Sequence, residues 1–518
     1  MSTSICLPSI GRLGRSRSAL SHESQISKYA PLCYVFQPVS NHHPSDRPHS
    51  TSIHILDDDS LIIIFRLCRP IFLDKDEDDS TRTIHREEWD RERWWYKLVK
   101  VCRRWRYLIL GSATHLHLRL ICAYGTPVVE MLAHSPPLPL IIDHLDKDRD
   151  ITTEDEEGIM LALQRRDRVC RIRIEMPHSN LQGLIMALSD EFPMLEYLYI
   201  VSPPPHSTSL ILDNTFRAPQ LRHLIMRNFA LTIGSPLLMT TVGLVTLSLQ
   251  KISMSAYFHP NDLLQRLSFM PQLEILTTTF SFPFPHDVAG QPSDTSIMTH
   301  VTLPNLRGFR FGGSSTYLEV VLSWITAPLL RRLEIAFSNE LNFSVPTLAN
   351  FVSKSENLRP IYAGLWIYNG GVFILADPHK GARVYALLIH VSCMHLNWLV
   401  AFAMQITNSL SPVFSTAERL ALANQPHGSL PEGHYKVDRT QWCTILRSFR
   451  NVKILCLGNE VVGELSRSLQ LDDGELTQEL LPELKELSYI ASWDTRDSFT
   501  SFIDARRIAG RPVKLIRR

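Results

Sequence analysis

The chain has 518 residues and is nearly neutral, with 53 lysine and arginine residues against 52 aspartate and glutamate residues. A net charge of +1 gives no global electrostatic reason to bind nucleic acid or an anionic membrane. The nine cysteines show no metal-finger spacing, and no apolar run approaches the length of a membrane span. We therefore expect a folded, reduced protein of the cytoplasm or nucleus, with no metal, no cofactor and no membrane segment.

The N-terminal stretch, residues 1–52, differs in composition from everything that follows it. It is rich in serine, histidine, proline and arginine, and its only acidic residues are Glu23 and Asp46. An arginine-rich, acid-poor start is also found in mitochondrial transit peptides. Its apolar residues, however, form no sustained helical face, so the sequence favours a disordered tail over residues 1–52.

Two amphipathic segments come next. Residues 56–65 place acidic residues in what would be a first helical turn, and an apolar run follows them and ends before Pro70. Residues 94–109 repeat apolar residues at i, i+4 and i+7, with basic residues along another face, which predicts one helix with a buried stripe. The acidic insertion between them, 74–92, lacks the glycine and the closing glutamate of an EF-hand loop, so we expect a solvated loop.

These two segments resemble the F-box, the three-helix module that joins substrate receptors to a Skp-family adaptor in cullin-based ubiquitin ligases. The first F-box helix commonly reads Leu-Pro-x-Glu-(Ile/Leu)-Leu-x-x-Ile-Phe, and the later part reads Val-Cys-(Arg/Lys)-x-Trp-(Arg/Lys). Residues 101–106, Val-Cys-Arg-Arg-Trp-Arg, match the later part closely. The chain departs from the first word at Asp57, where the family has proline, and at Ser60, where it has an aliphatic residue.

The resemblance implies an F-box-like helical module over residues 53–120. The residues at matching positions of the first helix, which the resemblance implies for adaptor contact, are Leu56, Asp59, Leu61, Ile64 and Phe65. The residues expected to hold the helices together as the module's core are Leu98, Val101, Cys102 and Trp105.

A short word recurs from about residue 151 onward, with an apolar residue followed by apolar residues three and five positions later. Its eight occurrences begin at Val169, Leu195, Leu221, Leu244, Leu306, Leu330, Val452 and Leu484. Alternating apolar residues mark strands with one buried face. Helical signals lie between the strands, at 153–166, 182–191, 261–270, 316–326, 395–410, 438–449 and 496–508. Proline follows several of these segments closely, as at Pro193 and Pro271, and should end the helix.

A strand-helix repeat of this kind predicts an α/β fold: the helical module, followed over residues 121–518 by an irregular leucine-rich-repeat-like solenoid. The alternative is an irregular α/β domain with leucine-rich strands. Strand order distinguishes the two, because it is sequential in a solenoid and shuffled in a doubly wound sheet.

An F-box-like segment followed by such repeats is similar to the expanded F-box families of fungi, whose arrays are usually inferred to recruit a protein substrate. The resemblance implies a noncatalytic SCF-type substrate receptor whose partners are a Skp-family adaptor, a cullin scaffold and an unknown protein target. A second interpretation is a diverged scaffold or interaction protein without adaptor binding, which Asp57 and the insertion at 74–92 favour.

Enzymatic and nucleic-acid functions have weaker support in the sequence. There is no nucleotide-binding glycine motif, no H-E-x-x-H and no G-x-S-x-G, so we expect no catalytic residue. His115 and His117 alternate around Leu116 as metal ligands on a strand would, but no third ligand lies nearby. The tryptophans of residues 94–105 share the apolar face instead of alternating with arginines, so they should be buried and unable to stack on bases.

Overall fold

The computed structural model describes thirteen stretches of the chain. They are residues 55–70, 92–145, 151–203, 210–212, 214–281, 300–338, 344–368, 371–377, 385–392, 396–425, 438–469, 480–489 and 497–517. The predicted tail at 1–52, and the acidic insertion up to residue 91, lie outside the described residues.

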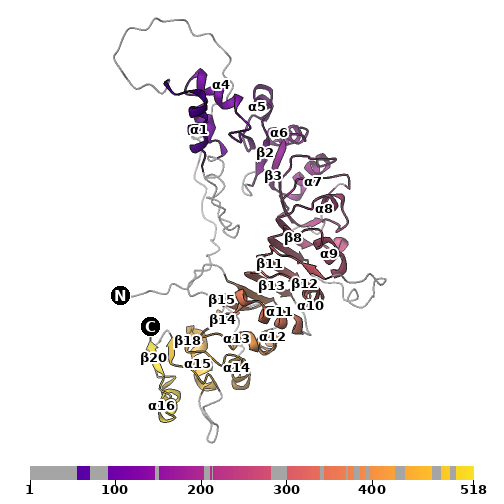
Figure 1. The fold of residues 1–518 in the computed structure, drawn as a ribbon. Helices are drawn as coiled ribbons and strands as arrows, with labels where there is room; N and C mark the ends of the chain where they lie inside the picture. Colours follow the sequence, from indigo (N-terminus) through magenta and orange to yellow (C-terminus); the bar gives the residue numbers. More distant parts are fainter. Residues whose placement is uncertain are drawn as a thin grey trace, which may run out of the picture.

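Sixteen strands form one long sheet, which follows the inner side of an arc while the helices lie along its outer side (Figure 1). In spatial order the strands are β1 (Leu120–Ala123), β2 (Leu140–His144), β3 (Val169–Glu175), β4 (Tyr197–Val201), β6 (His223–Arg227), β8 (Thr246–Ile252), β9 (Ile275–Phe280), β11 (Gly308–Gly313), β13 (Arg332–Ser338), β16 (Leu387–Ser392), β15 (Gly371–Asp377), β14 (Tyr362–Tyr368), β17 (Arg419–Gln425), β18 (Ile454–Leu457), β19 (Glu486–Tyr489) and β20 (Lys514–Arg517). Two small parallel sheets pair β5 (Leu210–Ile211) with β7 (Phe229–Ala230) and β10 (Val301–Thr302) with β12 (Ile325–Thr326).

The helices of the described chain fall into two groups: the first three precede β1, and the others lie between strands along the chain. They are α1 (Asp58–Leu67), α3 (Trp94–Leu98), α4 (Arg103–Gly111), α5 (Val128–His134), α6 (Thr153–Leu163), α7 (His178–Ala187), α8 (Pro236–Thr240), α9 (Pro260–Leu267), α10 (Ser315–Trp324), α11 (Pro346–Lys354), α12 (Leu396–Ser409), α13 (Ser411–Phe414), α14 (Arg439–Leu446), α15 (Asn459–Ser468) and α16 (Thr500–Ile508), with short 3-10 turns at Met254–Ala256 and Glu356–Leu358. The described chain is therefore a mixed α/β protein dominated by one long sheet, consistent with a leucine-rich-repeat-like solenoid.

The repeated word of the sequence builds this sheet. Leu198, Leu224 and Leu247 are neighbours in register on β4, β6 and β8, and each is fully buried. Parallel strands with one face under helices bury every second side chain, which is what the word encodes. All eight words fall on strands of the long sheet, and their order along it is sequential over β1 to β13, as a solenoid requires.

The strand order reverses at one place. After β13 the chain passes two strand positions to form β14, then returns through antiparallel β15 to β16, which pairs with β13. Helix α12 then crosses this meander, contacting β15 and β16, and leads to β17 beside β14. None of the eight predicted words lies on these three strands, and the sequence analysis predicted neither the antiparallel strand nor the reversal.

Helix ends differ from the predictions by a few residues. Helix α6 begins at Thr153 as predicted, with a capping box formed by Thr152 and Asp155, but it ends at Leu163, before the predicted end at residue 166. Helix α7 ends at Ala187, well before Pro193, since the Leu188 backbone leaves the helical region, with φ −82° and ψ 60°. Proline thus limits where the helix can end but does not fix its last residue.

Candidate functional site

The candidate site is the N-terminal helical module, and its first helix begins at Asp57. The Asp57 carboxylate accepts a hydrogen bond of 2.6 Å from the backbone N–H of Ser60, and Asp58 and Asp59 occupy the first turn. This hydrogen bond, with one from the Ser60 hydroxyl, lowers the pKa of Asp57 below its ordinary value. The acidic residue that stands where the resembling family has proline therefore acts as the N-cap of α1.

Helix α1 has two apolar faces with opposite environments. Leu61 and Phe65 lie one turn apart and are fully buried. Ile63 and Leu67, also one turn apart, are 60% and 79% exposed. Ile63 follows Leu61 by two residues, or about 200° around the helix axis, so the second pair points away from the module.

This arrangement corrects the expected adaptor contacts. Leu61 and Phe65 were expected to meet the adaptor, but they pack inside the module and have no surface to offer. Leu56 and Ile64 are half-buried, and Asp59 is exposed. The sequence pattern did not show that Ile63 and Leu67 stay exposed, because a run of consecutive apolar residues does not reveal which face of the helix is buried.

The predicted single helix over residues 94–109 is wrong, because the chain forms α3 and α4 with a turn between them. Cys102 is extended, with φ −156° and ψ 171°, and its Sγ accepts the Trp105 N–H at 3.5 Å to cap α4. The Arg106 guanidinium donates to the carbonyl of Val99 at 3.0 Å, which satisfies an acceptor in this turn. Val101 is consequently 58% exposed and does not belong to the core, contrary to expectation.

Helices α1 and α4 are held together by two contacts. The rings of Phe65 and Trp105 meet edge to face with centroids 4.9 Å apart. Arg104 donates to the Asp58 carboxylate and to the Leu56 carbonyl, each at 2.6 Å. Trp105, Leu98 and Cys102 are half-buried, so Trp105 covers Phe65 while keeping one edge near solvent.

The module shares its core with the beginning of the array. Trp95 of α3 is buried in the same apolar cluster as Leu120 of β1. Glu92, 9% exposed, lies 3.7 Å from a guanidinium nitrogen of Arg119 and 4.0 Å from one of Arg171 on β3. Burying a carboxylate is costly unless cations surround it, so this cluster fixes how the module sits on the array.

The inner face of the first repeats carries polar and aromatic side chains. Arg173 of β3 lies 3.4 Å from the Asp143 carboxylate of β2, and the Tyr199 hydroxyl donates to Glu175 at 3.4 Å. Burial, with the nearby Glu175 carboxylate, raises the pKa of Tyr199 to about 12. The Arg171 guanidinium lies 5.5 Å from the ring centre of Tyr197. Tyrosine and arginine held in this way are the residue types most often central to protein interfaces.

The reversed meander places a second aromatic group on the same inner face. Trp366, Phe373 and His390 are neighbours in register on β14, β15 and β16, and the rings of Phe373 and His390 stack with centroids 4.4 Å apart. The residues next in register are Ala336 on β13 and Ala423 on β17, so the aromatic row is three strands wide. Burial lowers the pKa of His390, so this ring is neutral at physiological pH.

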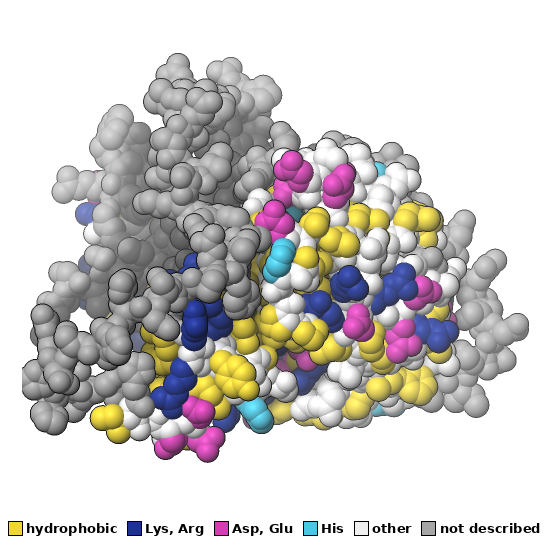
Figure 2. All heavy atoms as spheres, turned by 90° about the horizontal axis from the view of Figure 1, so that it is seen from above, with side chains coloured by type: hydrophobic (Ala, Val, Ile, Leu, Met, Phe, Trp, Pro, Cys, Tyr) yellow, Lys and Arg dark blue, Asp and Glu magenta, His cyan; other side chains and the backbone are white. Residues whose placement is uncertain are grey.

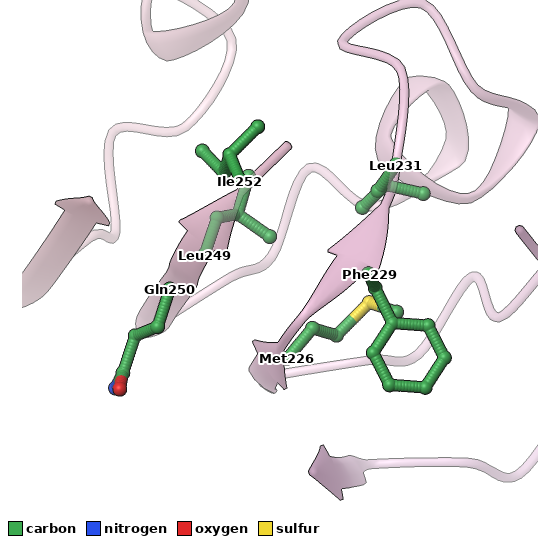
Figure 3. A pocket seen from close by; sticks show the side chains of 6 residues that line it. All are labelled: Met226, Phe229, Leu231, Leu249, Gln250 and Ile252. Atoms are coloured by element: carbon green, nitrogen blue, oxygen red, sulfur yellow. The ribbon is translucent and has the colours of Figure 1, made fainter. Parts of the chain in front are cut away.

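The described residues offer little room for a small ligand. A shallow hollow lies at the ends of β6 and β8, lined by Met226, Phe229, Leu231, Leu249, Gln250 and Ile252, and has no room for a water molecule (Figure 3). A second, nearby around Leu212 and Leu237, has a volume of about 30 Å³. Both are below the usual range of small-molecule sites, and five of the six side chains lining the first are apolar.

The histidine pair also lies elsewhere than expected. His115 and His117 occupy the turn before β1, where His117 has a left-handed backbone with φ 51°, so they do not share a strand face. Within the described ranges no group of three or more histidine, cysteine or acidic side chains could hold a metal ion. Among the same residues no helix is long and apolar enough to cross a membrane.

The surface around the module is chemically mixed. Viewed from above, basic, acidic and hydrophobic side chains alternate over the described part of the molecule (Figure 2). This pattern agrees with the near-zero net charge of the chain.

Comparisons with known proteins leave the family open. A scan against models of protein families and a search of curated proteins each found no match. Among solved structures, the chain is similar to the leucine-rich repeat-containing protein LegL7 from Legionella pneumophila, with 9% identity and a TM-score of 0.26 over 77% of this chain and 99% of that one. A TM-score this low does not establish a shared fold, so the repeat architecture is inferred from the strand order and registers given above.

Proposed function

We propose that this chain is a noncatalytic substrate receptor of a cullin-based ubiquitin ligase. In this proposal the helical module binds a Skp-family adaptor, and the array binds a protein target. The observation that carries the proposal is the pairing of α1 with α4 through Phe65 and Trp105, which leaves Ile63 and Leu67 facing solvent. Two large aliphatic side chains exposed together on one helical turn are a surface that a partner would cover.

In this proposal the adaptor contacts are assigned from the exposure of each side chain on α1, and not from the F-box sequence motif alone. Ile63 and Leu67 supply the apolar centre of the contact, Asp59 lies on the same exposed helix, and Leu56 and Ile64 lie at its margin. Leu61 and Phe65 act indirectly, because they hold α1 on α4.

The contact between module and array supports a receptor role. A receptor does no chemistry; it raises the concentration of a target lysine near a ubiquitin-conjugating enzyme carried by the same assembly. The burial of Glu92 between Arg119 and Arg171 keeps the array at a fixed orientation relative to α1. A target bound on the inner face would then be presented to the assembly in a single orientation.

The test is a pull-down of the full chain against a purified Skp-family adaptor. Ile63→Asp with Leu67→Asp should abolish binding while leaving the melting curve unchanged, since both side chains are exposed. Ile211→Asp with Met239→Asp is the matched control, because these residues are 71% and 56% exposed on the array. A native chain that is folded but does not bind, or equal losses in both variants, would contradict the proposal.

A repeat-based interaction scaffold without adaptor binding is the second candidate. It is favoured by Asp57, which caps α1 where the resembling family has proline. A scaffold would retain target binding by the array and would ignore the adaptor in the same pull-down.

A further inference from the structure

Arg266 of α9 is a buried arginine whose charge has no strong partner in the described structure. It lies on the buried side of the helix with Leu263 and Leu267 and is 5% exposed. One of its guanidinium nitrogens, Nη1, lies 3.4 Å from the sulfur of Met239 on α8. A thioether sulfur is a weak acceptor. The other two nitrogens, Nε and Nη2, have no hydrogen-bond partner among the described residues.

A second buried arginine, Arg506 of α16, provides a contrast. Its guanidinium donates to the carbonyls of Leu481, Pro482 and Leu484 at 3.2 to 3.3 Å, so it holds the chain before β19 in place. Arg266 makes no such bond to a carbonyl and pairs with no carboxylate in the described part of the chain. Burial lowers the pKa of Arg266, but an arginine keeps its charge at neutral pH. A buried charge without a partner destabilises a fold, so packing alone does not explain Arg266.

The two nitrogens without partners, Nε and Nη2, are a pair with which arginine binds oxygen. Elsewhere in this chain, Arg104 donates from Nε and Nη2 to the Asp58 carboxylate at 3.0 and 2.6 Å. Arg227 donates from the same two nitrogens to the Gln250 amide oxygen, at 2.9 and 2.7 Å. The same pair on Arg266 makes no such bond, and a carboxylate is the group that fits its fork geometry and its charge.

Two side chains that contact the Arg266 guanidinium lie at the surface. Met239 and Phe269 are 56% and 54% exposed, and the guanidinium carbon of Arg266 lies 5.6 Å from the centre of the Phe269 ring. The Phe269 N–H donates to the Arg266 carbonyl at 3.2 Å, so these two residues share one turn of the chain. Methionine has three rotatable side-chain bonds, and exposed side chains change rotamer quickly. Rotation of Met239 and Phe269 can therefore uncover Nε and Nη2 without a change in the backbone.

The neighbouring surface favours a protein ligand over a free anion. Helices α8 and α9 lie on the outer side of the arc (Figure 1). Methionine, phenylalanine and arginine are enriched in protein interfaces. Val242, three residues after Met239, is a further exposed apolar side chain. A small anion would pair with Arg266 but leave Met239 and Phe269 in water, whereas a protein can cover all three.

We propose that Met239, Arg266 and Phe269 form a docking surface, the outer patch, for a partner protein that presents a carboxylate beside an apolar side chain. The carboxylate pairs with Nε and Nη2 of Arg266, and the apolar side chain covers Met239 and Phe269. The outer patch involves neither α1 nor the inner face of the sheet. It therefore goes beyond the proposed adaptor binding, and its test is separate.

The experiment selects ligands from a displayed library of random linear peptides on the full chain, with excess Arg266→Met chain in solution to remove peptides that bind elsewhere. The selected peptides should carry an aspartate or glutamate next to a large apolar residue. In fluorescence anisotropy with a labelled selected peptide, Arg266→Met should weaken binding about 100-fold and Phe269→Ala about tenfold. The matched controls are Arg222→Met, at an exposed arginine before β6, and Leu329→Ala, at an exposed leucine before β13; both should bind normally.

The melting temperature separates a binding role of Arg266 from a structural one. Arg266→Met should melt no lower than the native chain, because it replaces a buried charge without a strong partner by an apolar side chain. A lower melting temperature would assign the guanidinium a structural role and overturn the proposal.

Three binding results would also overturn it. They are no selected peptide that depends on Arg266, equal losses in the control variants, and unchanged binding when the acidic residue of the peptide is replaced by its amide. A native dimer that Arg266→Met converts to a monomer in sedimentation would identify a second copy of the chain as the occupant. Tighter peptide binding after Asp287→Asn with Asp294→Asn would identify the chain's own segment between β9 and β10 as the occupant. Either outcome would overturn the assignment to a partner protein.

Discussion

Replacing Phe65 with alanine should release helix α1 from the module. The ring is 1% exposed and meets Trp105 edge to face at 4.9 Å, and burial of a phenylalanine of this kind contributes about 3–5 kcal/mol. We expect the lower end, about 3 kcal/mol, because Trp105 is half-buried and can relax into the space. Helix α1 has ten residues and is too short to persist without this contact.

Amide hydrogen exchange of α1, followed by mass spectrometry, measures this release. A loss of about 3 kcal/mol corresponds to exchange faster on the order of 100-fold. Ile63→Ala is the matched control on the same helix, and because Ile63 is 60% exposed it should change the opening free energy by less than about 0.5 kcal/mol. In a double-mutant cycle with Trp105→Ala, the two rings should couple by about 1 kcal/mol. Unchanged exchange in Phe65→Ala, or equal effects of Phe65→Ala and Ile63→Ala on the exchange of α1, would refute this packing argument.

The remaining predictions concern the array. Arg506→Met should lower the opening free energy of α16 by about 3 kcal/mol, because the buried carbonyls of Leu481 and Leu484 lose their donor. The matched control is Arg507→Met on the same helix, where the side chain is exposed and no such loss is expected. Equal rates of amide hydrogen exchange in α16 of the two variants would contradict this. Burial raises the pKa of Asp155, but its hydrogen bonds outweigh burial and lower it, so its stabilisation is complete above pH 3.8 and is lost as pH falls further. In urea, Asp155→Asn should therefore cost more stability at pH 7 than at pH 3, and a pH-independent difference would argue against it. Burial raises the pKa of Cys122 to about 12, so iodoacetamide at pH 8 should label exposed Cys68 and spare Cys122 in the native chain, as mass spectrometry would show.

The repeat words carried most of the fold because their signal is local. Leu198 and Leu224 lie on the face of the sheet that the helices cover, and both are buried, so period-two apolar patterning indicates both the strand and its buried face. The reversed meander shows the same alternation, with Leu387, Ile389 and Val391 buried on β16, but this pattern carries no information on strand direction. The direction of β15 depends on which strand pairs with the free edge of β13, and on the path of α12 over β15 and β16. Both are contacts between segments far apart in the sequence.

Helix breaks were harder to predict than helix faces. The apolar period of residues 94–109 continues through the turn before α4, so the pattern alone describes one helix. The break depends on Cys102, whose extended backbone and side-chain cap compete with a helical turn at Val101. A cysteine cap is weak, and only the docking of Trp105 on Phe65 makes it the better choice.

The sequence by itself determined the strand-forming words, most of the connecting helices, the near-neutral charge and the positions of the two amphipathic segments, since each depends on neighbouring residues along the chain. Tertiary structure decided which apolar residues remain for a partner: it buried Leu61 and Phe65 and left Ile63 and Leu67 exposed. The physical reason is that burial is set by contacts between elements that lie far apart along the chain, here the packing of Phe65 against Trp105.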